Sequence, residues 1–551
     1  MKLYVIGGVA GGATAAARAR RLNEEAEIVV FERGEYISFA NCGLPYHIGE
    51  VIKDRADLLV TTADNFGKRY NVDIRLFTEV TAIDTKNRQV HAKNLKTGET
   101  YSEGYDKIIL SPGAEPVRPP LPGIDSDKIF TLRNIPDTDR IKSFVDSKAP
   151  TSAVVVGGGF IGLEVAENLV FRGLRPTLIE KMEQVMPVMD YEMAGFMHSH
   201  LREKGVNLIL GDGIASFEEK DGGLIVHTEK GETVAADMAV LSIGVKPECH
   251  LARDAGLEIG ELGGIRVDDT MQTSDPNVYA VGDAVEVKDF GSGHSTMTPL
   301  AGPANKQGRI AADNVMGRRS NFRGTIGTSV VKLFDQTVAS AGAGEKTLQR
   351  RGIPYYVSYS HSGSHASYYP GAEMMAVKLL FSPGSGKILG AQIVGGEGVD
   401  KRIDVLATAI HGSMTVFQLE ELELAYAPPY GSAKDPVNMA GFVAANLMKG
   451  DVKKVDWNQY NDLDPETDVL LDVRDKDELE ESGEIPGALN IPVNELRNRL
   501  PELDKSKRYI PFCAIGLRGY IAYRMMKQHG FHVRNLNGGY KTLMGAKDKI
   551  M

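Results

Sequence analysis

Residues 153–169 read AVVVGGGFIGLEVAENL, and their pattern is the strongest structural signal in the chain. A buried strand is predicted first, then Gly157, Gly159 and Gly162 in GxGxxG spacing, then a helix. The next apolar strand, PTLIE, ends at Glu180. A helix N-terminus directs free N–H groups at a pyrophosphate, and a carboxylate at the second strand end can bond a ribose hydroxyl. The stretch predicts a dinucleotide site that prefers NADH, because Glu180 would repel a 2′-phosphate; Lys181 weakens this preference.

A similar unit opens the chain. KLYVI (2–6) predicts a strand and ATAAARARRL (13–22) a helix, and the strand EIVVFE ends at Glu32. Val9 occupies the place of the second fingerprint glycine, so a simple tight turn remains the alternative. The glycines of this loop are Gly7, Gly8, Gly11 and Gly12.

A third signal is VYAVGDA (278–284), which places Asp283 after an apolar strand. Ligands of open α/β sheets bind beyond the carboxyl ends of the strands, so Asp283 is expected to face a bound cofactor. A cap on a helix starting near Ala284 is the structural alternative.

Composition limits the classes of function. The 551 residues predict three or four domains, and a net charge of −10 disfavours nucleic acid as a partner. Three cysteines indicate a reducing compartment, so we expect a cytoplasmic protein. Glycines interrupt the apolar N-terminal run, which argues against a signal peptide, and no stretch approaches the length of a membrane span.

Together these motifs resemble the flavin-dependent pyridine nucleotide–disulfide oxidoreductases. The resemblance implies an α/β fold with two Rossmann-like domains, FAD on the first, a nicotinamide on the second, and Asp283 completing the FAD site. The implied domains are FAD-binding (1–112 and 250–320), NAD(P)H-binding (113–249) and dimerisation (323–446). The strands SVVKLFD and MMAVKLLF of the last domain are expected to be half-buried, with alternating burial.

Cys42, in SFANCGLPY (38–46), has no second cysteine nearby. Peroxide would convert its thiolate to a sulfenate, whereas a disulfide or persulfide would give a mixed disulfide. The single-cysteine peroxidases and oxidases of the family carry a histidine where this chain has Ala10. The segment resembles the coenzyme A-disulfide reductase branch instead.

That branch implies further site residues. Two tyrosines of the partner subunit approach the thiol, and the matching positions are Tyr368 and Tyr426, with Tyr369 and Tyr430 as adjacent candidates. A homodimer is therefore implied. The positions implied for coenzyme A are Thr14, Arg18, Arg21, Ser38, Asn41 and, from the other subunit, Lys434.

Reactivity of Cys42 requires a low thiol pKa. A turn followed by a short helix is predicted at NCGLPYHIGEVI, and we expect helix polarity and the flavin to stabilise the thiolate. His47 is expected to be structural, and Cys249 has no surrounding motif.

The tail changes in composition after a boundary near 448–455, and residues 456–551 resemble a rhodanese domain. Its centre is CAIGLR, Cys513 to Arg518, between the strand RYIPF and the helix GYIAYRMM. Successive loop amides and the helix end can favour a thiolate or persulfide at Cys513, and Arg518 can bind an anionic donor. Glu484 stands where this family often has histidine.

We therefore expect an FAD-dependent, NAD(P)H-driven reductase of coenzyme A persulfide, polysulfide or disulfide with an attached sulfurtransferase domain. Its partners would be sulfane-sulfur donors and its own second copy, and no metal or membrane is expected. The alternatives are a plain coenzyme A-disulfide reductase for thiol redox balance, or a redox-sensing sulfur-carrier module with a structural flavin. A water-forming oxidase is disfavoured by Ala10.

Overall fold

The computed structural model describes residues 1–550 and divides into two compact units. The first contains residues 1–183 and 205–325, and the second contains 184–204 and the chain from 326 onward. Both units combine helices with sheets, which confirms the predicted α/β fold. Within residues 1–550, none of the helices combines the length and apolar character that a bilayer crossing needs.

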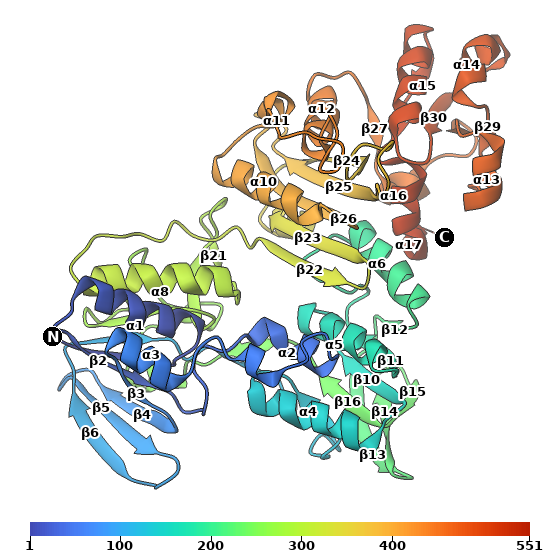
Figure 1. Cartoon of the computed structure of the whole chain (residues 1–551). Coiled ribbons are helices and arrows are strands. Elements are labelled where there is room, and N and C mark those ends of the chain that lie inside the picture. Colours follow the sequence, from blue (N-terminus) through green and yellow to red (C-terminus); the bar gives the residue numbers. More distant parts are fainter. Residues whose placement is uncertain (551) are drawn as a thin grey trace. The chain divides into compact units, whose positions relative to one another are not determined.

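The first sheet is parallel and draws strands from distant parts of the chain. Its order is β19 (Val278–Ala280), β7 (Lys107–Leu110), β1 (Lys2–Ile6), β2 (Glu27–Phe31) and β3 (Asp73–Arg75). Helix α1 (Ala10–Leu22) packs beside α8 (Ala301–Val315), as Figure 1 shows. Because parallel strands end at one edge, the glycine loop after β1 and Asp283 beyond β19 share that edge.

The second parallel sheet repeats this design. Its order is β12 (Asn207–Leu210), β11 (Arg175–Glu180), β10 (Ser152–Val156), β16 (Met238–Leu241) and β9 (Ile129–Thr131). Helix α5 (Phe160–Phe171) follows the loop after β10. The other helices of the first unit are α2 (Leu44–Ile48), α3 (Ala63–Tyr70), α4 (Ile135–Lys148) and α7 (His250–Asp254).

Smaller sheets complete the first unit. They are β4 (Thr78–Asp84), β5 (Gln89–Asn94) and β6 (Thr100–Gly104); β13 (Ile214–Lys220), β14 (Gly223–Thr228) and β15 (Thr233–Ala236); β18 (Ile265–Arg266), β20 (Val285–Lys288) and β21 (Ser295–Thr296); and β8 (Ala114–Pro116) with β17 (Val245–Pro247). Strand β20 begins directly after Ala284, so the helix considered there is absent and the capping alternative for Asp283 is wrong.

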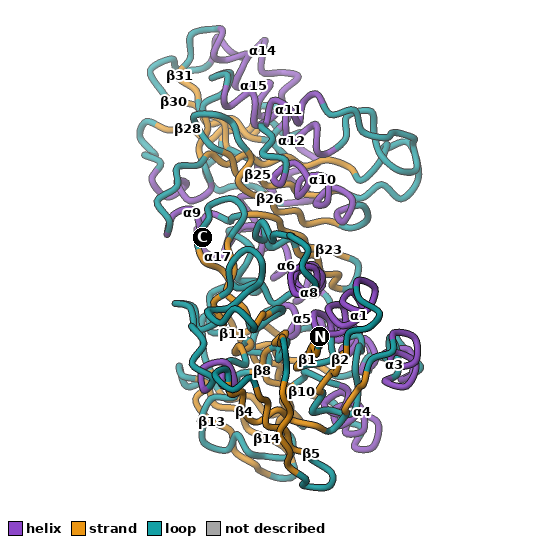
Figure 2. Tube along the Cα trace, turned by 90° about the vertical axis from the view of Figure 1, so that its left-hand side faces the viewer, coloured by secondary structure: helices purple, strands orange, loops and turns teal. Residues whose placement is uncertain are grey.

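The second unit is built on an antiparallel sheet. Its order is β22 (Ser329–Leu333), β23 (Gln336–Gly342), β26 (Ile388–Gly395), β25 (Met374–Phe381) and β24 (Tyr356–Gly363). Helix α10 (Val399–His411) lies along β26 in both views (Figures 1 and 2), and α11 (Val416–Glu421) packs on α12 (Pro436–Met448). The expected alternation holds for β22 but is wrong for β25, which is buried from Met375 onward because side chains cover both faces.

The C-terminal part has a parallel sheet of its own. Its order is β29 (Leu489–Asn490), β28 (Asp468–Asp472), β30 (Arg508–Phe512) and β31 (His532–Val533). Its helices are α13 (Lys476–Ser482), α14 (Val493–Arg499), α15 (Leu517–Gln528), α16 (Gly539–Gly545) and α17 (Lys547–Ile550). The connection after α12 is ordered, since β27 (Lys454–Val455) pairs with β32 (Asn535–Leu536).

Helix α6 (Tyr191–Glu203) lies between β11 and β12 in sequence but belongs to the second unit, so residues 113–249 do not group together. A Cβ on Gly195 would lie 1.7 Å from the Gly545 carbonyl oxygen, so α6 and α16 touch backbone to backbone. Helix α9 (Glu345–Arg350) follows β23. The C-terminal domain is thus packed into the second unit.

Candidate functional site

The two glycine loops have nearly the same geometry. Gly7 has φ +99° and Gly157 has φ +102°, in the region that favours glycine. A Cβ on Gly12 or Gly162 would lie 1.9 Å from the carbonyl oxygen of Gly7 or Gly157, respectively. Neither loop can therefore accept larger residues at these positions.

The two strand-end carboxylates also occupy matching places. Glu32 accepts from the Gly8 N–H at 2.9 Å, and Glu180 accepts from the Gly158 N–H at 2.6 Å. Each carboxylate is therefore fixed beside the loop that would hold a pyrophosphate. The Lys181 ammonium pairs with Glu229 at 2.9 Å.

The residues present fit the dinucleotides that the motifs predict. A Cβ on Gly159 would meet no atom within 4 Å, so the second loop has open space at the fingerprint position. In the first loop, a Cβ on Gly11 would lie 2.9 Å from a Val281 methyl. The backbone at Gly11 therefore lies close to the segment just beyond β19, which leads to Asp283. Burial raises the pKa of Asp283, against the opposing charge of Arg133.

Cys42 lies in the 3₁₀ turn Asn41–Gly43 just before α2, as predicted, and it is exposed. The chain's own groups act against the expected lowering of the thiol pKa, and the expected contribution of the flavin stays a prediction. Partial desolvation of the sulfur raises the pKa of Cys42, and the charges of Glu164 and Asp283 raise it further. Helix α2 has only five residues and does not offset these effects.

Glu164 is a site residue that sequence reasoning missed. It lies in the first turns of α5 and accepts a hydrogen bond from Tyr46 Oη at 3.2 Å. Burial raises the pKa of Glu164 to about 7, although the Tyr46 bond acts to lower it. Its place in the glycine-loop helix is visible in the sequence, but its approach to Cys42 depends on the packing of α2 against α5.

This carboxyl predicts a pH dependence of stability. The folded state keeps the Glu164 proton up to about pH 7, whereas the unfolded chain releases it near 4.5, so stability should fall as pH rises between these values. Glu164→Gln should remove about 3 kcal/mol of this change. Urea unfolding followed by circular dichroism at pH 5 and pH 8 measures it. Equal pH dependence in variant and wild type would contradict the assignment.

His47 and Cys249 are both buried in the protein. His47 is buried, and its Nδ1 lies 2.8 Å from the Ile52 carbonyl oxygen. Cys249 belongs to the hydrophobic core of the first unit, with its Sγ 3.6 Å from the Ala284 carbonyl oxygen. Neither contact points to chemistry.

The residues assigned to coenzyme A have mixed surroundings. Thr14 Oγ1 lies 2.5 Å from Asn305 Oδ1, and Arg18 donates to Asp313 at 2.7 Å. Arg21 stacks over Tyr70, with its guanidinium 5.9 Å from the ring centre, so the two arginines reach different neighbours. Ser38 has φ +48° in the loop leading to Cys42. Asn41 is exposed beside Cys42, and Lys434 is exposed in the second unit.

The second unit brings two predicted tyrosines together. The hydroxyl oxygens of Tyr368 and Tyr426 lie 2.7 Å apart, and the side chains are 73% and 47% exposed. The hydrogen bond with Tyr426 raises the pKa of Tyr368. Tyr369 instead packs edge-on against His365, and Tyr430 makes no such pair with Tyr426 in residues 1–550.

The rhodanese-like loop has the predicted strand–loop–helix form. Cys513 directly follows β30, is fully buried, and accepts the Gly516 N–H at its Sγ at 3.1 Å. The start of α16 holds the loop, since Tyr540 N–H donates to the Cys513 carbonyl at 2.8 Å. Arg518 donates to both carboxylate oxygens of Glu478, at 2.5 and 2.6 Å. Glu484 is exposed.

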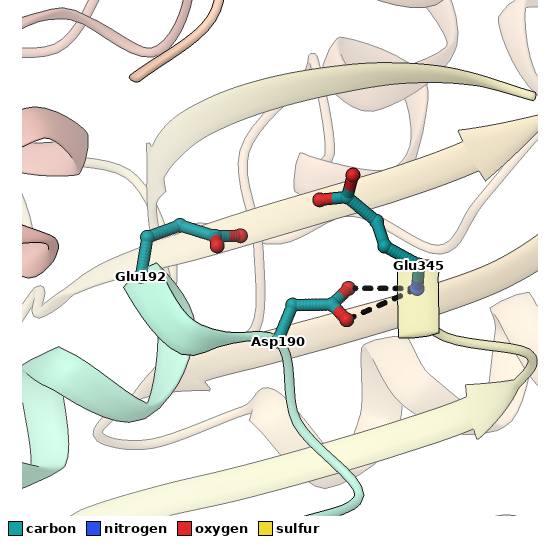
Figure 3. A group of neighbouring side chains, drawn as sticks. All are labelled: Asp190, Glu192 and Glu345. Atoms are coloured by element: carbon teal, nitrogen blue, oxygen red, sulfur yellow. Dashed lines mark hydrogen bonds between the residues drawn. The ribbon is translucent and has the colours of Figure 1, made fainter. Parts of the chain in front are cut away.

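Another charged cluster lies inside the second unit. The carboxylates of Asp190, Glu192 and Glu345 converge, and the Glu345 N–H donates to Asp190 (Figure 3). Lys378 Nζ lies 2.9 Å from Asp190 and 2.5 Å from each of Glu192 and Glu345. Burial acts to lower the pKa of Lys378, but Glu192 and the other acidic neighbours raise it overall. The ammonium therefore occupies the place that a metal ion would take.

Comparison with known proteins places these features in a family. Residues 1–308 match the pyridine nucleotide-disulphide oxidoreductase family, 328–436 match its dimerisation domain, and 457–546 match the rhodanese-like domain. A coenzyme A disulfide reductase of Staphylococcus haemolyticus is 38% identical over 447 residues, covering 81% of this chain and all of that protein.

Two solved structures span almost the whole chain. The reduced CoADR-RHD of Bacillus anthracis superposes with a TM-score of 0.97 at 51% identity, covering 100% of this chain and 98% of its own. The NAD-dependent persulfide reductase of A. fulgidus superposes with a TM-score of 0.93 at 39% identity, covering 98% of this chain and 100% of its own. The chain therefore belongs to the pyridine nucleotide-disulphide oxidoreductase family and is an oxidoreductase with a dimerisation domain and a C-terminal rhodanese-like domain.

Proposed function

We propose that this enzyme uses NADH to reduce coenzyme A persulfide and coenzyme A disulfide at Cys42, and that Cys513 handles sulfane sulfur. The observation that carries the proposal is the isolation of Cys42. It is exposed, whereas the other two cysteines, Cys249 and Cys513, are buried, so its natural disulfide partner is an external thiol. The names of the relatives support coenzyme A as that thiol.

The proposed cofactor sites follow from the two loops. FAD would be held by the first loop, Glu32 and Asp283, and NADH by the second loop and Glu180. Bound flavin would relay two electrons from NADH to sulfur. The orientation of the Glu180 carboxylate and the pairing of Lys181 with Glu229 support NADH over NADPH.

The sulfur chemistry balances as follows. The Cys42 thiolate attacks coenzyme A disulfide, forms a mixed disulfide and releases one coenzyme A thiolate. Two electrons break the mixed disulfide, and two protons neutralise the thiolates. For a persulfide the net reaction consumes NADH and a proton and yields coenzyme A thiol and hydrogen sulfide. The Tyr368–Tyr426 pair can supply a proton to the leaving thiolate.

Side-by-side assays test the proposal. NADH oxidation is measured with coenzyme A disulfide, coenzyme A persulfide and oxygen as acceptors, and again with NADPH as donor. We expect both coenzyme A substrates to be reduced, oxygen to be used poorly, and NADH to have the higher kcat/KM. Activity with coenzyme A disulfide alone would refute the persulfide part of the proposal and identify a plain coenzyme A-disulfide reductase. Activity with oxygen alone would refute the whole proposal.

The shared site gives a further prediction, since the tyrosine pair is proposed to act on the partner's Cys42 across a homodimer. Homodimers of Cys42→Ser and of Tyr368→Phe/Tyr426→Phe should each be impaired. Random subunit exchange makes half of the dimers mixed, each with one intact site, so about a quarter of wild-type turnover should return. Differential tags on the two variants show whether the subunits have exchanged. If they have exchanged and activity does not recover, the tyrosines act in their own chain's site or outside the mechanism.

A further inference from the structure

The cation beside the Cys513 sulfur is already paired with a carboxylate. Arg518 follows the loop on α15 and lies close enough to Cys513 for their charges to interact. Its guanidinium forms a two-pronged pair with Glu478, and its Nη1 also lies 3.4 Å from Asp475. A guanidinium paired in this way has few donors left for an incoming anion.

Glu478 is itself fixed in place. It is the third residue of α13, and its Oε2 accepts the Asp475 N–H at 3.1 Å while Asp475 caps the helix in return. This reciprocal capping box holds the Glu478 carboxylate where it meets Arg518. The pair is thus built into the helix start and does not depend on a freely rotating surface side chain.

The helix that carries Glu478 is acidic, and the helix after the loop exposes apolar side chains. Exposed acidic residues continue along and just beyond α13: Asp477, Glu480, Glu481 and Glu484. On α15, Leu517 is 59% exposed and Ile521, one turn later, is 43% exposed. A small dianion approaching Cys513 would find the Arg518 guanidinium already paired, whereas an uncharged arm could lie on the two apolar side chains.

We propose that Glu478 sets the donor specificity of this loop by neutralising Arg518, so that Cys513 takes sulfur from persulfides on uncharged thiol arms and uses thiosulfate poorly. This inference rests on the proposed sulfurtransferase role of Cys513 and names its donor class. Glu478 acts through Arg518 and is therefore a positioning residue.

The transfer step is balanced for both donors. The Cys513 thiolate attacks the outer sulfur of a persulfide, the S–S bond of the donor breaks, and a thiolate leaves. With thiosulfate the same attack releases sulfite, whose departing charge would need a free cation. Cyanide then removes the outer sulfur from Cys513 as thiocyanate and restores the thiolate.

The wild-type full-length protein gives the first test. Thiocyanate formation is measured with pantetheine persulfide and with thiosulfate as donors, and the Cys513→Ser rate is subtracted as direct cyanolysis. We expect kcat/KM for the persulfide to exceed that for thiosulfate by at least about tenfold, the scale of one charge-assisted hydrogen bond. If the wild-type protein uses both donors equally or prefers thiosulfate, the proposal is overturned, and no Glu478 variant is needed to show this.

Matched variants then test the residue. Glu478→Gln retains a capping side chain but releases the Arg518 charge, so kcat/KM for thiosulfate should rise about tenfold, mainly through KM, with little change for the persulfide. Glu481→Gln removes the same charge from the same helix without touching Arg518 and should change neither donor. In Glu478→Gln/Arg518→Ala the gain should disappear.

Each outcome has a distinct meaning. A gain that survives removal of Arg518, or that Glu481→Gln reproduces, shows a general charge effect and refutes the positioning role. The backbone N–H of Lys541 donates to the Ala514 carbonyl at 2.9 Å, so Lys541 belongs to a segment that contacts the loop. If the thiosulfate rate depends on Lys541, the cation that binds thiosulfate is not Arg518, and the positioning role of Glu478 is refuted. No Cys513-dependent transfer from either donor, with coenzyme A disulfide reduction intact, would instead refute the sulfurtransferase role itself.

Discussion

Replacing Cys42 with serine should abolish reduction of coenzyme A disulfide and persulfide, lowering kcat by at least about a thousandfold, the range found when a nucleophile is removed. The remaining cysteines are not expected to substitute, because Cys249 lies in the core of the first unit and Cys513 belongs to the loop of the rhodanese-like domain in the second. A serine hydroxyl does not form the mixed disulfide on which the proposed reaction depends. Steady-state NADH oxidation with each substrate measures the loss.

The same variant should still bind FAD. The proposed cofactor contacts come from the glycine loops, Glu32 and Asp283, and Cys42 contributes none of them. Its flavin content and the rate of flavin bleaching by NADH should therefore stay close to wild type, and Cys249→Ser serves as the matched cysteine control. Most of the reductase activity surviving in Cys42→Ser would remove Cys42 from the mechanism, whereas loss of flavin would indicate a misfolded site.

Local patterns predicted much of this structure because they depend on neighbours in sequence. A glycine loop between a strand and a helix produces the same turn wherever it occurs, so Gly7 and Gly157 have matching geometry in two separate sheets. The strand and helix flanking Cys513 were predictable for the same reason. Tyr368 and Tyr426 were singled out by family resemblance and not by a local pattern, since 58 residues separate them in sequence.

Features that depend on packing between distant elements were not predictable. Glu164 lies near Cys42 only because α5 packs on α2, and its charge adds to the burial of the sulfur in raising the thiol pKa. Arg518 was expected to await an anion, but the fold places Glu478 against it. The change in composition near 448–455 indicated a boundary, but not that residues 454–455 pair as a strand with residues 535–536.

The position of α6 shows the same limit. Its sequence follows a nucleotide-binding strand, but Asp190 and Glu192 at its start are held in the second unit by Lys378 of β25. Tyr359 of β24 also donates to Glu192 at 3.0 Å. On the other side α6 meets α16, whose first residues hold the Cys513 loop. The buried charge cluster therefore holds one end of α6, and the other contacts of α6 reach the helix that holds the Cys513 loop.

Replacing Lys378 with methionine should lower the free energy of unfolding of the second unit by about 3–5 kcal/mol, the usual cost of breaking a buried ion pair from one side. Lys378 is fully buried. Among the ion pairs of residues 1–550, it is the only cation paired with Asp190, Glu192 and Glu345, and the substitution would remove it. Urea unfolding can be followed through Trp457, the sole tryptophan, which reports on the second unit.

The pH dependence separates charge from packing in this variant. Burial raises the pKa of Glu192, and the Lys378 charge acts to lower it. Without Lys378 this pKa would rise further and Glu192 would take up a proton on folding, so the loss of stability should be larger at pH 8 than at pH 5. Glu192→Gln in the same chain should restore part of the stability at pH 8, because one uncompensated charge is gone. Lys332→Met, on the exposed side of β22 in the same sheet, should change stability by less than about 1 kcal/mol. A Lys378→Met protein as stable as wild type at pH 8 would show that Lys378 does not compensate the charges of the three carboxylates, and the ion cluster would then not hold α6 in place.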